Sequence, residues 1–170
     1  LAPTSVSFTS AGDTATLVAT VRDAGGTVIS NPTVTWATAN ASVVTVSVAG
    51  LVTAVTDGTT TITATSGSAS ATATATVSQV AQSVTLAPTS VSFTSAGDTA
   101  TLVATVRDAA GNIISGATVT WVTSSSSVAT VSTAGLVTAV ADGTATITAT
   151  SGSASGTATV TVNQTAASIT

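Results

Sequence analysis

The sequence of 170 residues contains no cysteine, histidine, methionine or tyrosine, and its only charged side chains are two arginines and six aspartates. General acid–base and nucleophilic catalysis use groups whose pKa can be tuned toward neutrality, or a serine beside such a group. A pair of aspartates can hydrolyse glycosides, but only in a cleft with aromatic or polar subsites, which two tryptophans and two phenylalanines cannot line. We therefore expect no enzyme and no catalytic residue.

The same shortages exclude several ligands and partners. Zinc and iron sites need histidine or cysteine, so no cofactor of that kind is expected. The net charge of −4 and the absence of lysine argue against nucleic acid, because phosphates are neutralised by clustered cations. Threonine and serine interrupt every apolar run, so no stretch reaches the roughly 20 residues that insert into a membrane as a helix. Charged residues make up only 5% of the chain, against about a quarter in typical domains, which favours an extracellular or cell-surface location.

Calcium is the one metal that the composition leaves open, because it binds through oxygen ligands such as carboxylates. If the chain forms two linked units, each a sandwich of seven alternating strands, three aspartates are expected near the link at Ser83. They are Asp13, Asp57 and Asp108. They would form a calcium site at that junction. The alternative is that these aspartates serve turns, where a carboxylate bonds to nearby backbone amides.

The sequence repeats itself with a period of 85 residues. The segment Leu1–Phe8 recurs as Leu86–Phe93, and every residue from Leu1 to Arg22 is identical to its counterpart in Leu86–Arg107. A repeat of this length is in the size range of a small domain that folds alone. We therefore predict one repeat over residues 1–80 and a second over 81–165, with residues 166–170 beginning the first strand of a following repeat.

Within each repeat, apolar and polar residues alternate with the period of two that is typical of half-buried strands. In the segment Thr99–Val106, one face carries Ala100, Leu102, Ala104 and Val106, and the other face is rich in threonine. Glycine- and aspartate-containing turns separate about seven such runs in each repeat. This pattern predicts an all-β chain of two tandem immunoglobulin-like β-sandwiches, each of about seven antiparallel strands.

Four aromatic side chains are the expected core anchors of the two sandwiches. Trp121 follows Val119 at a two-residue step, so both should face the core, and Trp36 takes the same place in the first repeat. Phe8 and Phe93 are the corresponding anchors on the first strand of each repeat. The alternative for the tryptophans is a role in stacking against a ligand.

Several short segments of the second repeat together resemble the bacterial immunoglobulin-like domain of group 2. They are Gly97–Thr99, Val119–Trp121, Val128–Val131, Gly135–Ala139, and Gly143 with Thr146–Ala149. The resemblance covers both repeats. It implies a stalk, spacer or adhesive module of the kind found in intimin- and invasin-like adhesins and in surface-layer proteins, and it carries no catalytic residues.

The near-identity of the two repeats favours a structural function over a binding function. A spacer gains from repetition, because each unit need only fit the next, and uncharged strand edges also allow lateral self-association. We therefore expect a segment of a longer surface array that forms a rod, fibre or filament. The alternatives are an adhesin domain that binds a receptor, glycan or other surface ligand, and an ice-binding face along Thr72–Thr76.

The position at which the repeat is interrupted predicts head-to-tail self-association. Leu1 lies in the middle of the first predicted strand, and Ala166–Thr170 matches the missing first half, Ala81–Thr85. The inter-unit strand would therefore combine Ala166, Ser168, Ile169 and Thr170 with Leu1 of the next window. The two parts would be joined either by a peptide bond in a longer protein or by strand donation between subunits.

Overall fold

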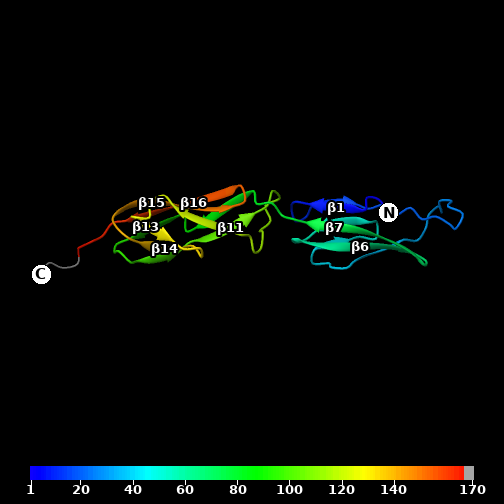
Figure 1. Cartoon of the computed structure of the whole chain (residues 1–170), viewed down its shortest axis with the longest axis horizontal. Coiled ribbons are helices and arrows are strands. Elements are labelled where there is room, and N and C mark those ends of the chain that lie inside the picture. Colours follow the sequence, from blue (N-terminus) through cyan, green and yellow to red (C-terminus); the bar gives the residue numbers. More distant parts are fainter. Residues whose placement is uncertain (167–170) are drawn as a thin grey trace. The chain divides into compact units, whose positions relative to one another are not determined.

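The computed structural model describes residues 1–166, which are built from β-strands and connecting turns (Figure 1). The chain divides into two compact units, unit 1 over Leu1–Val80 and unit 2 over Ala81–Thr170. In the described part, no helix is long and apolar enough to cross a membrane. The strands confirm the all-β fold that the alternating sequence predicts.

Unit 2 contains the more complete set of strands. Two sheets face each other, one in the order β12-β15-β16-β9 and the other in the order β10-β14-β13, and a further pair joins β11 to β8. All of these pairs are antiparallel except β16 with β9, which is parallel. The strands are β8 (Ser83–Ala87), β9 (Ser90–Phe93), β10 (Thr99–Thr101), β11 (Val103–Arg107), β12 (Thr120–Thr123), β13 (Ala129–Val131), β14 (Leu136–Ala139), β15 (Gly143–Ser151) and β16 (Ala154–Val162).

Unit 1 repeats the two larger sheets with the same registers. Its sheets have the orders β1-β7-β6-β3 and β2-β5-β4, and Thr14 faces Thr53 as Thr99 faces Thr138 in unit 2. The strands are β1 (Ser5–Phe8), β2 (Thr14–Thr16), β3 (Thr35–Thr38), β4 (Val44–Val46), β5 (Leu51–Ala54), β6 (Gly58–Ser66) and β7 (Ala69–Val77).

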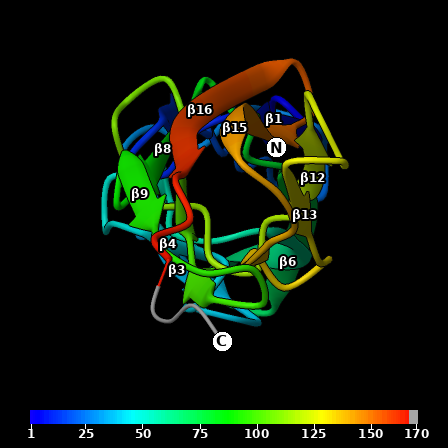
Figure 2. The ribbon, with the colours of Figure 1, turned by 90° about the vertical axis from the view of Figure 1, so that its left-hand side faces the viewer.

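The core of each unit lies between its sheets and consists of small aliphatic side chains. Leu102, Val137 and Ile147 are fully buried in unit 2, as are Leu17 and Ile62 in unit 1. Figure 2 shows labelled strands of unit 2 around this core, including β8, β9, β12, β13, β15 and β16. Each aliphatic side chain taken from water contributes about 1.5–3 kcal/mol, so the alternation of the strands determines which face is buried.

Thr60 on β6 is a polar exception within the core of unit 1. Its hydroxyl is buried and has no hydrogen-bond partner among the described residues, whereas unit 2 has Ala145 at the matching position. An unpaired buried hydroxyl costs free energy that a methyl group of the same shape does not. We expect Thr60→Val to stabilise unit 1 by about 1 kcal/mol in chemical denaturation, and a destabilised variant would show that the hydroxyl is satisfied.

One segment of identical sequence adopts different structures in the two units. Val103–Arg107 forms β11 because it pairs with β8, with Val106 opposite Val84. The same five residues at Val18–Arg22 form no strand in unit 1, where an isolated bridge joins Val18 to Ala2. Since the sequences match, the presence of a pairing partner decides the conformation.

Gly156 on β16 lies directly under β8. A Cβ atom at this position would approach the carbonyl oxygen of Val84 to 2.3 Å, although the backbone conformation of Gly156 suits any residue. We expect Gly156→Ala to destabilise unit 2 by about 2 kcal/mol, the usual cost of overpacking, because β8 must move away. Chemical denaturation of the variant measures this change, and unchanged stability would show that β8 is not held against β16.

Candidate functional site

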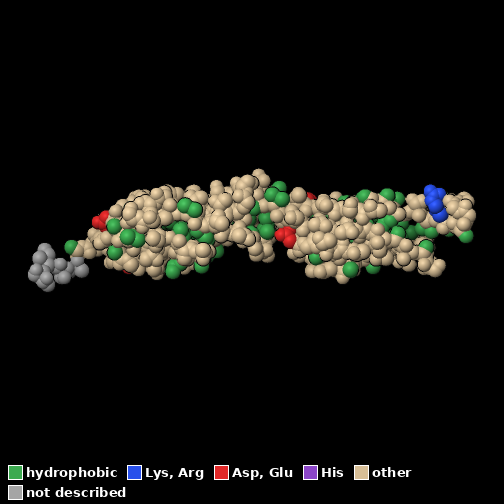
Figure 3. All heavy atoms as spheres, in the orientation of Figure 1, with side chains coloured by type: hydrophobic (Ala, Val, Ile, Leu, Met, Phe, Trp, Pro, Cys, Tyr) green, Lys and Arg blue, Asp and Glu red, His purple; other side chains and the backbone are tan. Residues whose placement is uncertain are grey.

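Charged side chains are sparse and dispersed in the structure. Figure 3 shows one face on which nearly all side chains are uncharged. The Nη1 atoms of Arg22 and Arg107 donate hydrogen bonds to the carbonyl oxygens of Gly26 and Gly111, at 2.9 and 2.8 Å. Across residues 1–166, no three acidic, histidine or cysteine side chains gather as a metal site requires.

The aspartates at the first turn of each unit accept hydrogen bonds from local backbone amides. Oδ2 of Asp13 accepts from the N–H groups of Thr9 and Ser10, at 3.2 and 3.0 Å. Asp98 repeats the arrangement in unit 2, with its Oδ2 atom accepting from two residues of the same turn. These carboxylates fix the turn that follows the first strand of each sandwich.

A second pair of aspartates holds the chain where it leaves the last strand of each unit. Oδ1 of Asp57 accepts a hydrogen bond from the N–H of Gln79 at 2.6 Å, and Oδ1 of Asp142 accepts from Gln164 at 2.7 Å. Each carboxylate therefore ties the exit segment to the turn before β6 or β15. Hydrogen bonds to ionised acceptors are shorter and stronger than neutral ones.

Asp108 organises the turn after β11 and is only 2% exposed. Its Oδ1 atom accepts from the N–H groups of Ala110 and Asn112, at 3.0 and 2.9 Å. Asp23 makes the matching turn in unit 1, where its Oδ1 atom accepts from Gly25 and Thr27, but it is exposed.

The three residues predicted to bind calcium belong to separate turns. Asp13 and Asp57 lie in unit 1 and Asp108 lies in unit 2, so the junction site stays a prediction. Because each carboxylate accepts backbone hydrogen bonds as a turn residue does, we expect the melting temperature to be the same in millimolar calcium and in EDTA. A calcium-dependent rise would support the junction site, since a ligand that binds only the folded state stabilises it.

The aromatic residues differ in how deeply they are buried. Phe8 and Phe93 are 5% and 6% exposed, whereas Trp36 and Trp121 are partly buried and pack against the edge of each core. Each indole lies against a glycine, because a Cβ atom added at Gly50 or Gly135 would meet Cζ2 of the tryptophan at 2.9 Å.

The partly exposed face of Trp36 lines an open hollow in unit 1. This hollow has a volume of about 260 Å³ and is also lined by Leu17, Val18, Val34 and Val48. Its walls are mostly aliphatic, and it contains no ionisable group.

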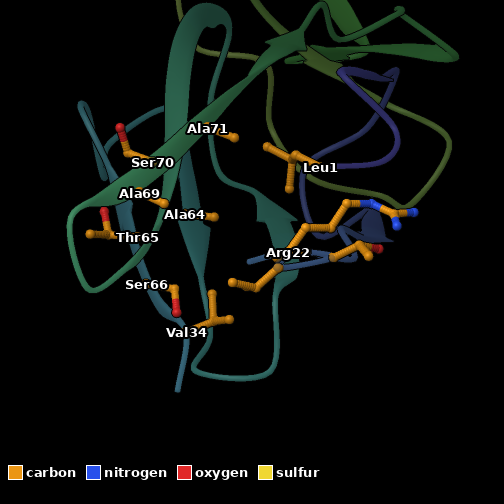
Figure 4. Close-up of a pocket in the computed structure, with 12 residues that line it drawn as sticks. Leu1, Arg22, Val34, Ala64, Thr65, Ser66, Ala69, Ser70 and Ala71 are labelled. Carbon is orange, nitrogen blue, oxygen red and sulfur yellow. The ribbon is translucent and has the colours of Figure 1, made fainter. Parts of the chain in front are cut away.

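A groove runs along unit 1 at the position that β8 occupies in unit 2. We call it the unit 1 groove; its volume is about 140 Å³, and the side chains of Leu1, Ala64 and Ala71 point into it (Figure 4). Its apolar lining also includes Ala19, Val21, Val34 and Ala69, and Arg22 lines it as well. Its size resembles the cavity of about 150 Å³ that truncation of a buried leucine leaves in a core.

The residues predicted to form the inter-unit strand are placed only in part. Leu1 is partly buried and packs against the core of unit 1, and Ala166 is exposed. Ser168, Ile169 and Thr170 lie outside the described residues. The sequence indicated an interrupted strand at Leu1, but it did not identify the groove beside it. The lining of that groove comes from four separate segments: Leu1, residues 19–22, Val34 and residues 64–71.

A family model described as bacterial Ig-like domain (group 2) matches residues 2–77 and 80–162. This match confirms the family resemblance, the two tandem immunoglobulin-like sandwiches and the extracellular or cell-surface location that the sequence predicted. Among curated proteins, no sequence matches the chain.

Several solved structures resemble the chain. Domains 1–6 of the surface layer protein SbsC are 28% identical over 89% of this chain, with a TM-score of 0.47. Invasin, described as a bacterial integrin-binding protein, is 22% identical over 86% of this chain and 35% of its own length, with a TM-score of 0.50. The Yersinia pseudotuberculosis adhesin InvE is 17% identical over 95% of this chain and 57% of its own, with a TM-score of 0.50. The chain spans about a quarter of the SbsC structure, 23% of its length.

Proposed function

Because the chain belongs to the bacterial Ig-like domain family of group 2, we propose that it is a structural repeat module of an extracellular array, which builds a rod, fibre or filament. The observation that carries this proposal is the repetition of the same strand registers on nearly the same residues in both units. Repetition of this kind suits a spacer, because the stability of a repeat protein is approximately the sum of the stabilities of its similar units and of the contacts between neighbouring units.

The surfaces of the described strands support a structural function. The outward residues of β6 and β7 include Thr59, Thr61, Thr72 and Thr74, which are exposed. Edge strands β3 and β12 carry no charged residue, so nothing on them repels a neighbouring strand. Such edges also permit lateral self-association between modules.

The length of chains with different numbers of tandem units tests the proposal. Chains that contain two, four and six units should show a maximum dimension in small-angle X-ray scattering that rises in proportion to the number of units. A panel of glycans and matrix proteins should show no saturable binding to any of them. A maximum dimension that stops rising with added units would contradict the structural array.

A second candidate function is that of an adhesin domain, and the hollow beside Trp36 favours it. Aromatic faces at shallow sites are common contact points for ligands, and this face is partly exposed. If unit 1 is an adhesin, the chain should bind a surface glycan or protein with saturation, and Trp36→Phe should weaken that binding without unfolding the unit. Binding that Trp36→Phe leaves unchanged would exclude the hollow as the site.

A further inference from the structure

We propose that the outward face of the smaller sheet in each unit is a contact surface for a second copy of this chain, and that two chains pair laterally through it. The smaller sheet is β2-β5-β4 in unit 1 and β10-β14-β13 in unit 2. The inference rests on the proposed structural function, because it names the surface through which the modules of one array contact those of another. The contact is made by side chains on the face of a sheet, and not by the backbone of an edge strand.

Large apolar side chains point outward from the smaller sheet of unit 1. Leu51 on β5 is 41% exposed, and Val55, which continues the alternation one residue beyond that strand, is 40% exposed. On the neighbouring chain segment, Val18 follows β2 by two residues and is 59% exposed. The intervening Leu17 and Val52 are buried, so the exposed residues share the outward side of the sheet.

Unit 2 presents the same side chains to nearly the same extent. Leu136 is 41% exposed, Val140 is 43% exposed and Val103 is 59% exposed. In both units the valine of the first pair of strands bridges an alanine, as Val103 does with Ala87, so its surroundings are alike. We call these two sets of residues the apolar patches; they are Val18, Leu51 and Val55 in unit 1, and Val103, Leu136 and Val140 in unit 2.

The larger sheet of each unit has an outward face of a different character. Within residues 1–166, the strands β6, β7, β15 and β16 carry no exposed large apolar side chain, and their outward positions are rich in threonine, such as Thr61 and Thr146. Val122 on β12 is exposed, but unit 1 has Ala37 at that position. Single exposed apolar residues are normal, whereas a cluster that recurs in both units indicates an interaction surface.

Charged groups are absent from the strands that carry the apolar patches. None occurs in β2, β4 or β5, or in their counterparts β10, β13 and β14. The aspartates nearest in sequence in unit 1, Asp13 and Asp57, accept hydrogen bonds from backbone amides. Arg22 lies four residues beyond Val18 and donates to a backbone carbonyl. This face therefore offers no charge for a charged partner to complement, and an apolar surface of the same kind fits it.

The repetition of the patch favours a second copy of the chain as that partner. The two apolar patches recur with the 85-residue period of the sequence. A partner contacts both patches at once only if its own contact surfaces recur with the same spacing, and a second copy meets this condition. A twofold axis between the two chains brings like surfaces together, which is the isologous arrangement of most homodimers.

The size of the patches limits how strongly two short chains associate. Three strands about 4.8 Å apart, each contributing about five residues, cover roughly 240 Å². A pair of two-unit chains therefore buries about 1,000 Å² in total, less than the roughly 1,200–2,000 Å² of stable interfaces. A pair of six-unit chains buries about 2,900 Å², and contacts that are linked within one chain reinforce one another. We therefore expect weak pairing of the 170-residue chain and much tighter pairing of a longer array.

Sedimentation equilibrium of the 170-residue chain and of a six-unit tandem chain tests the proposal. The short chain should form a reversible dimer with a dissociation constant of about 0.1–1 mM. The six-unit chain should pair with a dissociation constant at least about 100-fold lower. In both cases the mass should stop rising at two chains, because each unit has its apolar patch on only one sheet.

A pair of charged substitutions locates the contact. Leu51→Lys combined with Leu136→Lys should raise the dissociation constant at least about tenfold, because the contact loses apolar area and must bury charge. Thr61→Lys combined with Thr146→Lys is the matched control, since it changes the net charge equally on the outward face of the larger sheets. The control should leave the dissociation constant unchanged. Thermal melting within a few degrees of the parent shows that both variants are folded.

Three results would each overturn the proposal. They are a six-unit chain that stays monomeric up to about 1 mM, a mass that continues to rise beyond two chains, and association that the two pairs of lysine substitutions weaken equally. None of them changes the maximum dimension that X-ray scattering measures for covalent tandem chains. The lateral contact and the structural array therefore fail independently.

Discussion

Alanine in place of Gly135 is expected to lower the free energy of unfolding of unit 2 by about 3 kcal/mol. The residue has φ of +77°, and a Cβ there would meet the carbonyl oxygen of Leu102 at 2.4 Å and the Trp121 indole at 2.9 Å. Left-handed backbone costs an alanine about 1–2 kcal/mol, and overpacking adds about 1–3 kcal/mol. Chemical denaturation that resolves the two units measures the change.

Gly97→Ala is the matched control for this substitution. Gly97 has φ of +87°, but no atom lies within 4 Å of its added Cβ, so only the backbone cost of about 1 kcal/mol is expected. If the two variants lose the same stability, the contact between the turn at Gly135 and Trp121 contributes nothing. That result would also remove the physical reason for a glycine against each tryptophan.

Replacement of Trp121 by alanine should cost unit 2 about 3 kcal/mol, the lower part of the range for large aromatic residues. The lower part applies because the indole is partly buried and packs at the edge of the core, against Gly135. In a unit this small, that loss is a large share of the total stability, so the melting temperature of unit 2 should fall by more than 10 °C, given about 4–8 °C per kcal/mol.

Val122→Ala is the control for the tryptophan variant, since Val122 follows Trp121 on β12 and is 64% exposed on the other face of the strand. It should change the melting temperature of unit 2 by only a few degrees. A Trp121→Ala protein that melts together with this control would mean that the indole is not a core anchor.

The sequence predicted the strands well where burial alone determines them. In β14 and β15 the alternation of the sequence matches the alternation of burial, and the fully buried Val137 and Ile147 occupy inward positions of those strands. The prediction failed where a pairing strand or a backbone hydrogen bond determines the conformation of a segment. The alternating segment Thr99–Val106 indicated one continuous strand, but β10 and β11 are separated at Leu102, whose N–H donates to the Gly135 carbonyl at 2.9 Å.

The candidate site was harder to predict from the sequence than the strands were. The 85-residue offset relates Ala71 to Gly156, yet no pattern in either residue signals that a strand passes over Gly156 at close range. Likewise, Val18–Arg22 and Val103–Arg107 are identical in sequence and differ in structure. Local sequence cannot distinguish them, because the difference arises from the residues that pair with them.

Hydrogen exchange at Thr20 and Thr105 tests the difference between the two units most directly. Both amides lie between an alanine and a valine, so their intrinsic exchange rates match, and differences report structure alone. In dilute solution, the Thr105 amide should be protected by β8 and the Thr20 amide should exchange rapidly. An extension with the sequence of Ala81–Thr85 before Leu1 should then protect Thr20. Equal protection of the two amides without that extension would contradict the account that a pairing strand decides the conformation of this segment.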